Sequence, residues 1–178
     1  MTVPPLTLAR VNALDREQFR ARLGALFEGP PWIVDAAWER RPFASVAQLY
    51  EALCAVMRAA PRERQVALIQ AHPDLVGRAA LAGTLGKASR GEQASAGLDR
   101  LSPDEVATFQ RLNAEYQARF GFPFVICARE NSKAMILAGF AARLPQTRDA
   151  EIAGALDEIA KICALRLRDI VRDDEEVP

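Results

Sequence analysis

Residues 102–123 read SPDEVATFQRLNAEYQARFGFP, and this stretch carries a complete set of helix signals. Ser102 suits the N-cap, Pro103 suits the first helical position, and an acid such as Glu105 favours the first turn. Gly121 is a typical residue just past a helix end. Between these signals, apolar residues recur at helical spacing: Val106, Phe109, Leu112, Tyr116 and Phe120. The stretch therefore predicts one long amphipathic helix.

The same signals recur along the rest of the chain and predict an all-α protein. Asp15 with Gln18 fits a capping box that opens another helix. We therefore expect a single-domain multi-helix bundle of about eight or nine helices over residues 1–178, with its core at about 12–171. Besides the helix at 102–121, the apolar period predicts helices at about 15–27, 32–40, 45–57, 61–72, 94–98, 132–144 and 147–171.

Composition excludes several classes of protein. The 178 residues fit one domain, and the 23 basic and 23 acidic residues cancel, which disfavours a nucleic-acid partner. No apolar run is long enough to cross a membrane, and Met1 to Leu8 lacks the features of a signal peptide. The three cysteines are odd in number and widely spaced, which indicates free thiols. The expected location is the reducing cytoplasm, since the final Glu-Val-Pro is no peroxisomal signal.

Two stretches depart from the helical pattern. A glycine- and alanine-rich stretch from Val76 to Lys87 is the best candidate for a functional loop. Pro123 to Cys127 reads as extended and apolar, and no second convincing strand is available to pair with it. Its backbone N–H and C=O groups then need other partners. A bound ligand could supply these hydrogen-bond partners, or helix ends, side chains and water could supply them. The sequence leaves both alternatives open.

His72 is the only histidine in the chain. A lone histidine in a helical protein is more often structural than catalytic. Here, however, it ends a predicted helix, and Pro73 biases it away from helical geometry. The C-terminal end of the helix dipole favours the imidazolium form, and a histidine that holds a proton near neutral pH is a natural general acid.

The run SRGEQ at residues 89–93 is a second candidate. Ser-x-x-Glu is the pattern of a capping box, which would open the short helix at 94–98 and serve the structure alone. A capped helix N-terminus beside a glycine-rich loop also offers backbone N–H groups to an anion or a carbonyl. In that interpretation, Glu92 and Gln93 hydrogen-bond a polar ligand.

The last predicted helix carries one arginine within its apolar stripe, which comprises Ile152, Leu156, Ile159, Cys163 and Ile170. Arg166 falls on this stripe, whereas Arg168 points to the opposite face. Because a buried unpaired charge is costly, Arg166 must pair or reach a cavity, and its guanidinium suits a carboxylate. The alternatives are an arginine that reaches solvent from the edge of the stripe, or one paired with a structural acid.

The cysteines suggest two further kinds of site. Cys127 or Cys163 with His72 would make a thiol nucleophile, and three cysteines with one histidine would bind zinc. Neither idea has a local signature, because the chain contains no Cys-x-x-Cys and no close metal-ligand spacing. A glycine fingerprint for phosphate binding is also missing from the sequence. We therefore disfavour both cysteine sites.

Taken together, these motifs resemble one family, the 2-oxo-4-hydroxy-4-carboxy-5-ureidoimidazoline (OHCU) decarboxylases. The similar motifs are LIQAHPDL at 68–75, SRGEQASAGL at 89–98, FGFPFVI at 120–126 and RRPF at 40–43, with the helix around Arg166. The resemblance covers about Asn12 to Val171. The motifs at 68–75, 89–98 and 120–126, in this order and at this spacing, are specific for the family, although any one of the three alone would be weak.

The resemblance implies an all-helical fold, usually dimeric, with no metal and no organic cofactor. It implies His72 as the catalytic acid and Glu92 as a second catalytic residue. The implied partners are a small ureidoimidazoline substrate and a second copy of the chain. The residues placed around the substrate are Pro73, Ser89, Arg90, Gly91, Glu92, Gln93, the backbone of Phe124, Val125, Ile126, Cys127 and Ala128, and Arg166.

The implied substrate carries its carboxylate and a hydroxyl on one ring carbon, next to an imine carbon. Loss of CO2 pushes electrons into the imine, so no pyridoxal, thiamine or metal is needed. We expect His72 to supply or relay the returning proton and Glu92 to orient the hydroxyl or ureido group. Arg166 would neutralise the carboxylate or position Glu92. The alternative functions are a non-catalytic helical scaffold and a hydrolase that uses Cys127.

Overall fold

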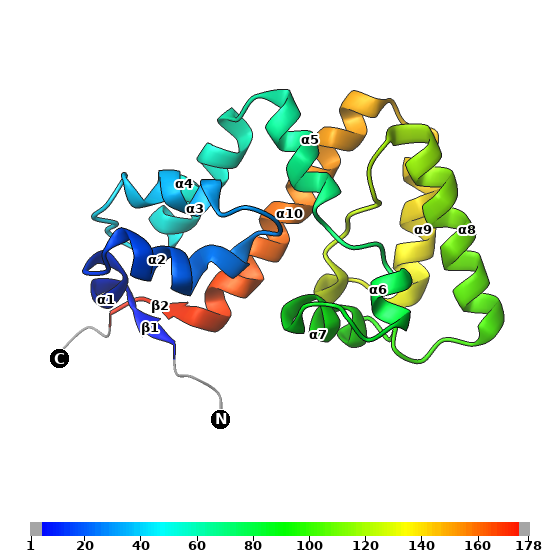
Figure 1. Ribbon diagram of the computed structural model, residues 1–178, viewed down its shortest axis with the longest axis horizontal. Helices are drawn as coiled ribbons and strands as arrows, with labels where there is room; N and C mark the ends of the chain where they lie inside the picture. Colours follow the sequence, from blue (N-terminus) through cyan, green and yellow to red (C-terminus); the bar gives the residue numbers. More distant parts are fainter. Residues whose placement is uncertain (1–4, 175–178) are drawn as a thin grey trace. The chain divides into compact units, whose positions relative to one another are not determined.

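The computed structural model describes residues 5–174, and these residues are mostly helical, which confirms the predicted fold class (Figure 1). Part of the stretch Met1 to Leu8 and the final Glu-Val-Pro lie outside the described residues. The α-helices are α1 Leu8–Asn12, α2 Arg16–Leu23, α3 Trp32–Trp38, α4 Val46–Ala59, α5 Arg62–Gln70, α6 Arg78–Leu81, α7 Lys87–Ser95, α8 Pro103–Phe120, α9 Lys133–Arg143 and α10 Arg148–Ile170. The shorter elements are the 3-10 helices η1 Gly24–Leu26 and η2 Ala128–Glu130 and the strands β1 Leu6–Thr7 and β2 Val171–Arg172.

Local signals account for the helix boundaries. Asp15 forms the expected capping box with Gln18 at the start of α2, and Ser102 forms one with Glu105 at the start of α8. Gly121 caps the end of α8 with a φ of 80°, a left-handed conformation that glycine adopts without steric cost. These ends were predicted because the capping contacts lie within a few residues of one another in sequence.

The described residues divide into two compact units, and each is described by itself. Whether residues 1–178 behave as a single domain remains a prediction. The first unit holds the chain as far as Gln65 and from Ala160 onward. Within it, β1 pairs in parallel with β2, and α2 and α4 each pack against α3. The strand pair was not predicted, because two residues are too few to show a strand period.

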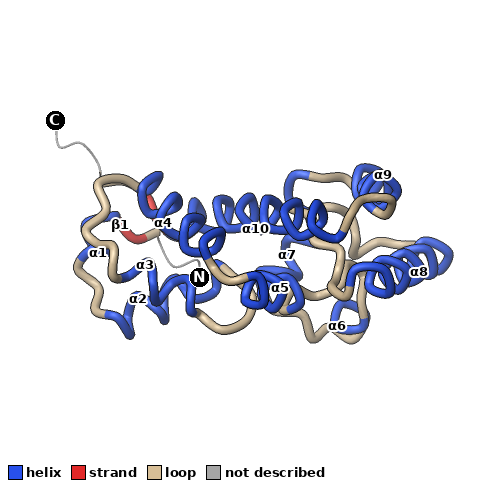
Figure 2. Tube along the Cα trace, turned by 90° about the horizontal axis from the view of Figure 1, so that it is seen from above, coloured by secondary structure: helices blue, strands red, loops and turns tan. Residues whose placement is uncertain are grey.

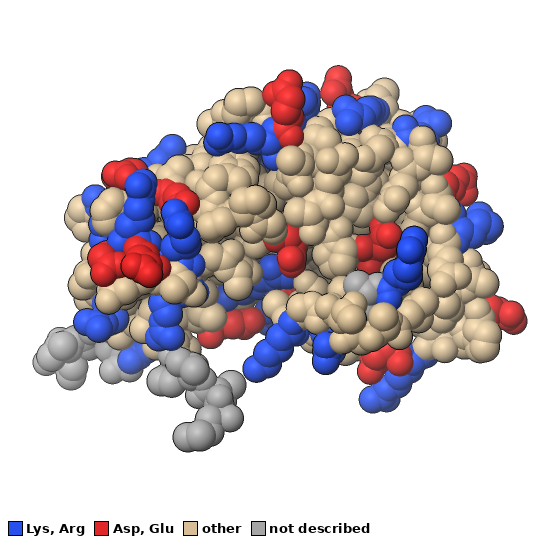
Figure 3. Space-filling model, viewed as in Figure 1, with Lys and Arg blue, Asp and Glu red and all other residues tan. Residues whose placement is uncertain are grey.

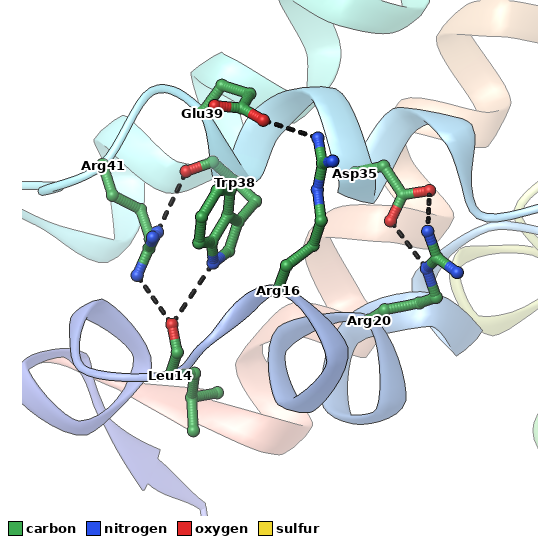
Figure 4. A network of polar contacts seen from close by, with 7 residues as sticks. All are labelled: Leu14, Arg16, Arg20, Asp35, Trp38, Glu39 and Arg41. Carbon is green, nitrogen blue, oxygen red and sulfur yellow. Dashed lines mark hydrogen bonds and ion pairs between the residues drawn. The ribbon is translucent and has the colours of Figure 1, made fainter.

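A polar network around Arg41 joins the segments of this first unit (Figure 4). The Arg41 guanidinium donates to the carbonyl oxygens of Trp38 at 2.9 Å, Asn12 at 2.9 Å and Leu14 at 2.7 Å. It also lies 4.0 Å from the centre of the Trp38 ring, a cation–π distance. Arg41 of the RRPF motif thus joins the chain at residues 12–14 to the end of α3.

The second unit runs from Val66 to Ile159 and has an aromatic core. The rings of Phe124 and Phe140 stack with centroids 3.9 Å apart, and Tyr116 meets Phe124 edge-on at 5.2 Å. Gly139 on α9 permits this packing, because a Cβ there would lie 3.3 Å from the Phe124 ring. The non-helical chain between α8 and α9 is drawn as a loop in Figure 2.

Two predictions in the second unit were wrong. The stretch from Val76 to Lys87 is not one loop, because it contains α6. The capping box at residues 89–93 is absent: α7 begins at Lys87 with Gly86 as its N-cap, so Ser89 already lies in the first turn. The helix therefore starts before residue 94, because Ser89, Gln93 and Ala96 form a buried face at helical spacing. A short polar pattern cannot reveal that face by itself.

Figure 3 shows basic and acidic side chains interspersed over the face that it draws. Among residues 5–174, no helix is both long enough and apolar enough to cross a membrane.

Candidate active site

His72 lies just beyond the end of α5 and is 8% exposed. Its Nδ1 atom is 2.9 Å from the carbonyl oxygen of Leu68, one helical turn earlier. A carbonyl oxygen only accepts hydrogen bonds, so Nδ1 must carry a hydrogen and donate it. The neutral and the charged ring then both keep their hydrogen on Nδ1, so a change of protonation takes place at Nε2.

The chain from His72 to Val76, here called the His72 loop, is held by side-chain amides. Gln93 donates to the Asp74 carbonyl at 3.3 Å and accepts from the Val76 N–H at 3.1 Å. Asn113 donates to the Leu75 carbonyl at 2.7 Å. Val76 has a φ of 53°, a strained value for a β-branched residue, so the surrounding contacts must enforce it. The side chain of Gln93 thus joins the first and second motifs directly.

The five residues of the second motif divide between two faces of α7. Ser89 and Gln93 are buried and Glu92 is half-buried, whereas Arg90 and Gly91 are exposed. Arg90 donates to the carbonyls of Gly83 at 2.7 Å and Leu85 at 3.2 Å, and so holds the preceding turn. The chemistry of this motif is therefore expected from Ser89, Glu92 and Gln93.

Pro123 to Cys127, here called the extended segment, is neither helix nor paired strand, as predicted. Arg143 donates to the Val125 carbonyl at 2.7 Å. The Cys127 N–H donates to the Glu158 carboxylate at 2.8 Å, and Asn131 donates to the Cys127 carbonyl at 2.9 Å. For these backbone groups the question left open by the sequence is answered: their partners are side chains of the protein.

The extended segment ends against α7. η2, which follows Cys127 directly, packs on α7. The pKa of the Cys127 thiol is raised to about 11. Burial is the main cause, and the nearby carboxylates of Glu130, Glu158 and Glu92 contribute to the same rise. A thiol with this pKa stays protonated at neutral pH, which argues against Cys127 as a nucleophile. Among residues 5–174, moreover, no three histidine, cysteine or acidic side chains gather into a possible metal site.

The three cysteines, Cys54, Cys127 and Cys163, are free thiols, as the sequence predicted, and the structure shows all three to be buried.

Arg166 belongs to the first unit and is 7% exposed, whereas Arg168 is exposed, so the predicted helical register is confirmed. It donates to the Ala25 carbonyl at 3.1 Å and forms an ion pair with Glu28 at 3.0 Å. The sequence left open whether Arg166 pairs with an acid, reaches a cavity or extends to solvent, and the structure pairs it with Glu28, a carboxylate that the sequence did not indicate.

Four residues that hold the extended segment and its surroundings were not predicted: Tyr116, Arg143, Glu151 and Glu158. Arg143 ends a helix, where a basic residue usually faces solvent. Glu151 did carry a usable signal. It lies four residues before Ala155 on the buried face of α10, so the reasoning applied to Arg166 would have demanded a partner for it.

The comparisons with known proteins agree with these motifs. The model of the family described as OHCU decarboxylase matches residues 12–168. The chain is 41% identical over 167 residues to 2-oxo-4-hydroxy-4-carboxy-5-ureidoimidazoline decarboxylase of Amia calva, covering 94% of this chain and 95% of that protein. It is 42% identical over 162 residues to the enzyme of the same name from Haloferax volcanii, covering 91% and 94% of the two chains.

Solved structures share the fold. A crystal structure of (S)-allantoin synthase superposes with a TM-score of 0.75 at 24% identity, covering 93% of this chain and 54% of that one. A crystal structure of OHCU decarboxylase in the presence of (S)-allantoin gives a TM-score of 0.65 at 18% identity, covering 86% and 96%. The match to the family model extends over most of the sequence, and the motifs that carried the resemblance lie within it. The chain therefore belongs to the OHCU decarboxylase family.

Proposed function

We propose that this protein decarboxylates 2-oxo-4-hydroxy-4-carboxy-5-ureidoimidazoline to (S)-allantoin in the degradation of urate, without a cofactor. The observation that carries the proposal is His72. It is a buried imidazole whose Nδ1 hydrogen bonds to the Leu68 carbonyl, so proton exchange takes place at Nε2, in a chain of this family. A carboxy-lyase of this kind needs one positioned proton donor rather than an added electron sink.

The substrate itself accepts the electrons. When the C–C bond to the carboxylate breaks, its electron pair moves toward the neighbouring imine carbon and nitrogen, and CO2 leaves. The ureido-bearing carbon must then receive a proton on one face. We assign that proton to Nε2 of His72, a step that is worth about 10²–10⁴-fold in rate when the acid is well placed.

The other residues hold the ring in place. Glu92 would orient the hydroxyl or ureido group, and Ser89 and Pro73 would lie against the substrate. The backbone of Phe124 to Ala128 would bind the ring and ureido amides. Gln93 acts on the site through the His72 loop, since its amide is bonded to Asp74 and Val76.

Arg166 would neutralise the substrate carboxylate or position Glu92. We also propose that the protein acts in the cytoplasm as a homodimer.

The test uses substrate prepared immediately beforehand from urate with urate oxidase and the upstream hydrolase. After addition of this protein, circular dichroism should show rapid formation of one allantoin enantiomer, the (S) form. In D2O the product should carry one deuterium on the ureido-bearing carbon. Racemic product at the uncatalysed rate would refute the proposed function.

A further inference from the structure

A buried charged network lies behind the extended segment. Arg143 donates through Nε to Glu151 at 2.8 Å and through Nη2 to the Tyr116 hydroxyl at 3.3 Å. Tyr116 in turn donates its hydroxyl hydrogen to Glu151. Glu151 is 2% exposed, Tyr116 is fully buried and Arg143 is half-buried, so the three side chains form a largely buried set within the second unit. A buried pair of charges holds its geometry closely, because loss of either partner leaves the other uncompensated.

The third donor of the guanidinium reaches the backbone. Nη1 of Arg143 donates to the Val125 carbonyl at 2.7 Å, and the guanidinium Cζ lies 4.4 Å from the Phe124 ring centre. The planar fork of arginine fixes these directions together, which the flexible ammonium of lysine does not do. The position of Val125 is thus tied to that of Glu151 and Tyr116.

This contact also orients the next residue. Because a peptide group is planar and trans, the Ile126 N–H points away from the Val125 carbonyl and hence away from Arg143. The Cys127 N–H is bound to Glu158, so the Ile126 carbonyl, in the same peptide group, points away from Glu158. In extended backbone, the N–H and C=O of one residue face the same side. Ile126 therefore presents a donor and an acceptor together, on the side opposite Arg143 and Glu158.

We infer that Arg143 is a positioning residue: it fixes the Val125 carbonyl so that the N–H and C=O of Ile126 form an edge that binds an amide of the substrate. An edge with one donor and one acceptor complements the N–H and C=O of a ureido or ring amide. The inference rests on the proposed function and adds to it the residue that holds the recognition edge in place.

The test compares two arginines of the same unit. Arg148 is a matched control: it donates to the Phe120 carbonyl at 3.0 Å and lies 5.5 Å from the Phe122 ring centre, but it holds the end of α8 rather than the extended segment. Steady-state kinetics and thermal unfolding are measured for Arg143→Lys and Arg148→Lys. A lesion that only unfolds part of the sample lowers kcat and leaves KM unchanged, whereas a displaced recognition edge raises KM.

We expect Arg143→Lys to raise KM about tenfold, the effect of losing roughly one well-made hydrogen bond. We expect Arg148→Lys to keep KM within about twofold of wild type. A second variant, Ile126→Pro, deletes the donor of the edge without touching the charged network, and it suits an extended backbone. It should raise KM by a similar factor.

The outcomes separate the two proposals. If the wild-type protein forms no (S)-allantoin, the proposed function fails and the inference fails with it. If the wild type is active and Arg143→Lys keeps the wild-type KM, the inference alone is overturned, and the same holds if Ile126→Pro keeps it. An Arg143→Lys protein that unfolds at the assay temperature is compared with wild type below its unfolding temperature, where an unchanged KM likewise overturns the inference.

Discussion

The His72 loop and the extended segment are both non-helical stretches of the second unit, but they are held by different chemistry. Neutral amides hold the His72 loop: Gln93 binds Asp74 and Val76, and Asn113 binds Leu75. Charged groups make two of the side-chain contacts to the extended segment, since Arg143 binds Val125 and Glu158 binds the Cys127 N–H, while the amide of Asn131 binds the Cys127 carbonyl.

This difference matches the role proposed for each stretch: proton donation by His72, and substrate binding by the backbone of the extended segment. An imidazole that gives up a proton responds to every nearby charge, and the amides of Gln93 and Asn113 add none of their own. A segment that binds through its backbone needs fixed direction instead, and bonds to charged groups are shorter and stronger than neutral ones. We therefore expect changes in the two regions to affect different kinetic constants.

The largest expected effect tests His72 itself. His72→Asn keeps size and polarity but removes the exchangeable proton, so turnover should fall at least about a hundredfold, within the range for a general acid. Thermal unfolding should show a folded protein. A variant with near-normal kcat would exclude His72 as the proton donor and would reduce its loop to a structural element.

The next largest expected effect tests the neutral amide of Gln93, which holds the His72 loop. Gln93→Met keeps the length of the side chain but leaves the Val76 N–H and the Asp74 carbonyl without their partner. The free energy of unfolding should fall by about 1–3 kcal/mol, the cost of an unsatisfied buried group, and kcat should fall with it as His72 moves. Gln117→Met is the control, because Gln117 binds only the Asp74 side chain at an exposed position. Equal losses in both variants, measured by urea unfolding, would contradict this role.

A smaller expected effect tests the charged carboxylate of Glu158, which binds the extended segment. Glu158→Gln retains an acceptor for the Cys127 N–H but removes the charge, so that hydrogen bond weakens by about 1 kcal/mol. KM should rise severalfold while kcat changes little, the reverse of the pattern for Gln93→Met. Asp157→Asn, on the exposed face of the same helix, should leave both constants unchanged. If Glu158→Gln lowered kcat and left KM unchanged, the proposed difference between the two regions would be wrong.

The smallest effect concerns the Cys127 side chain, since the segment is proposed to act through its backbone. Cys127→Ala should keep activity within about threefold, and thiol alkylation of the native protein should not abolish it. Burial raises the pKa of Cys127 from 9.0 to about 11, so between these values the folded state keeps a proton that the unfolded state has lost. Stability should fall as pH rises through that window, and Cys127→Ala should flatten the fall in a pH series of thermal unfolding.

The same contrast explains what the sequence revealed. Caps such as Ser102 with Glu105 depend on neighbours a few residues apart, so the helices they start were predictable. Arg166 was recognised as buried because its helix is long enough to define a stripe. The place of His72 just beyond a helix end was predicted from Pro73, and its catalytic role stays a prediction.

The contacts that determine the site were less visible, because they join residues far apart in the chain. Glu158 lies 31 residues from Cys127, and Arg143 lies 18 from Val125. No local pattern identifies such pairs. The wrong capping box at Ser89 has the same origin: the start of α7 is set by what its inner face packs against, and a polar pattern four residues long does not contain that information.

The hydrogen bond from His72 to Leu68 has a consequence for the timing of catalysis. Because Nδ1 is engaged, the imidazole carries protons through one atom only, so on the proposed mechanism the proton delivered by Nε2 must be regained at Nε2. Each cycle then contains a reloading step that is separate from bond cleavage and draws on solvent. In mixed H2O and D2O, the isotope content of each product molecule would record the solvent proton acquired since the previous turnover.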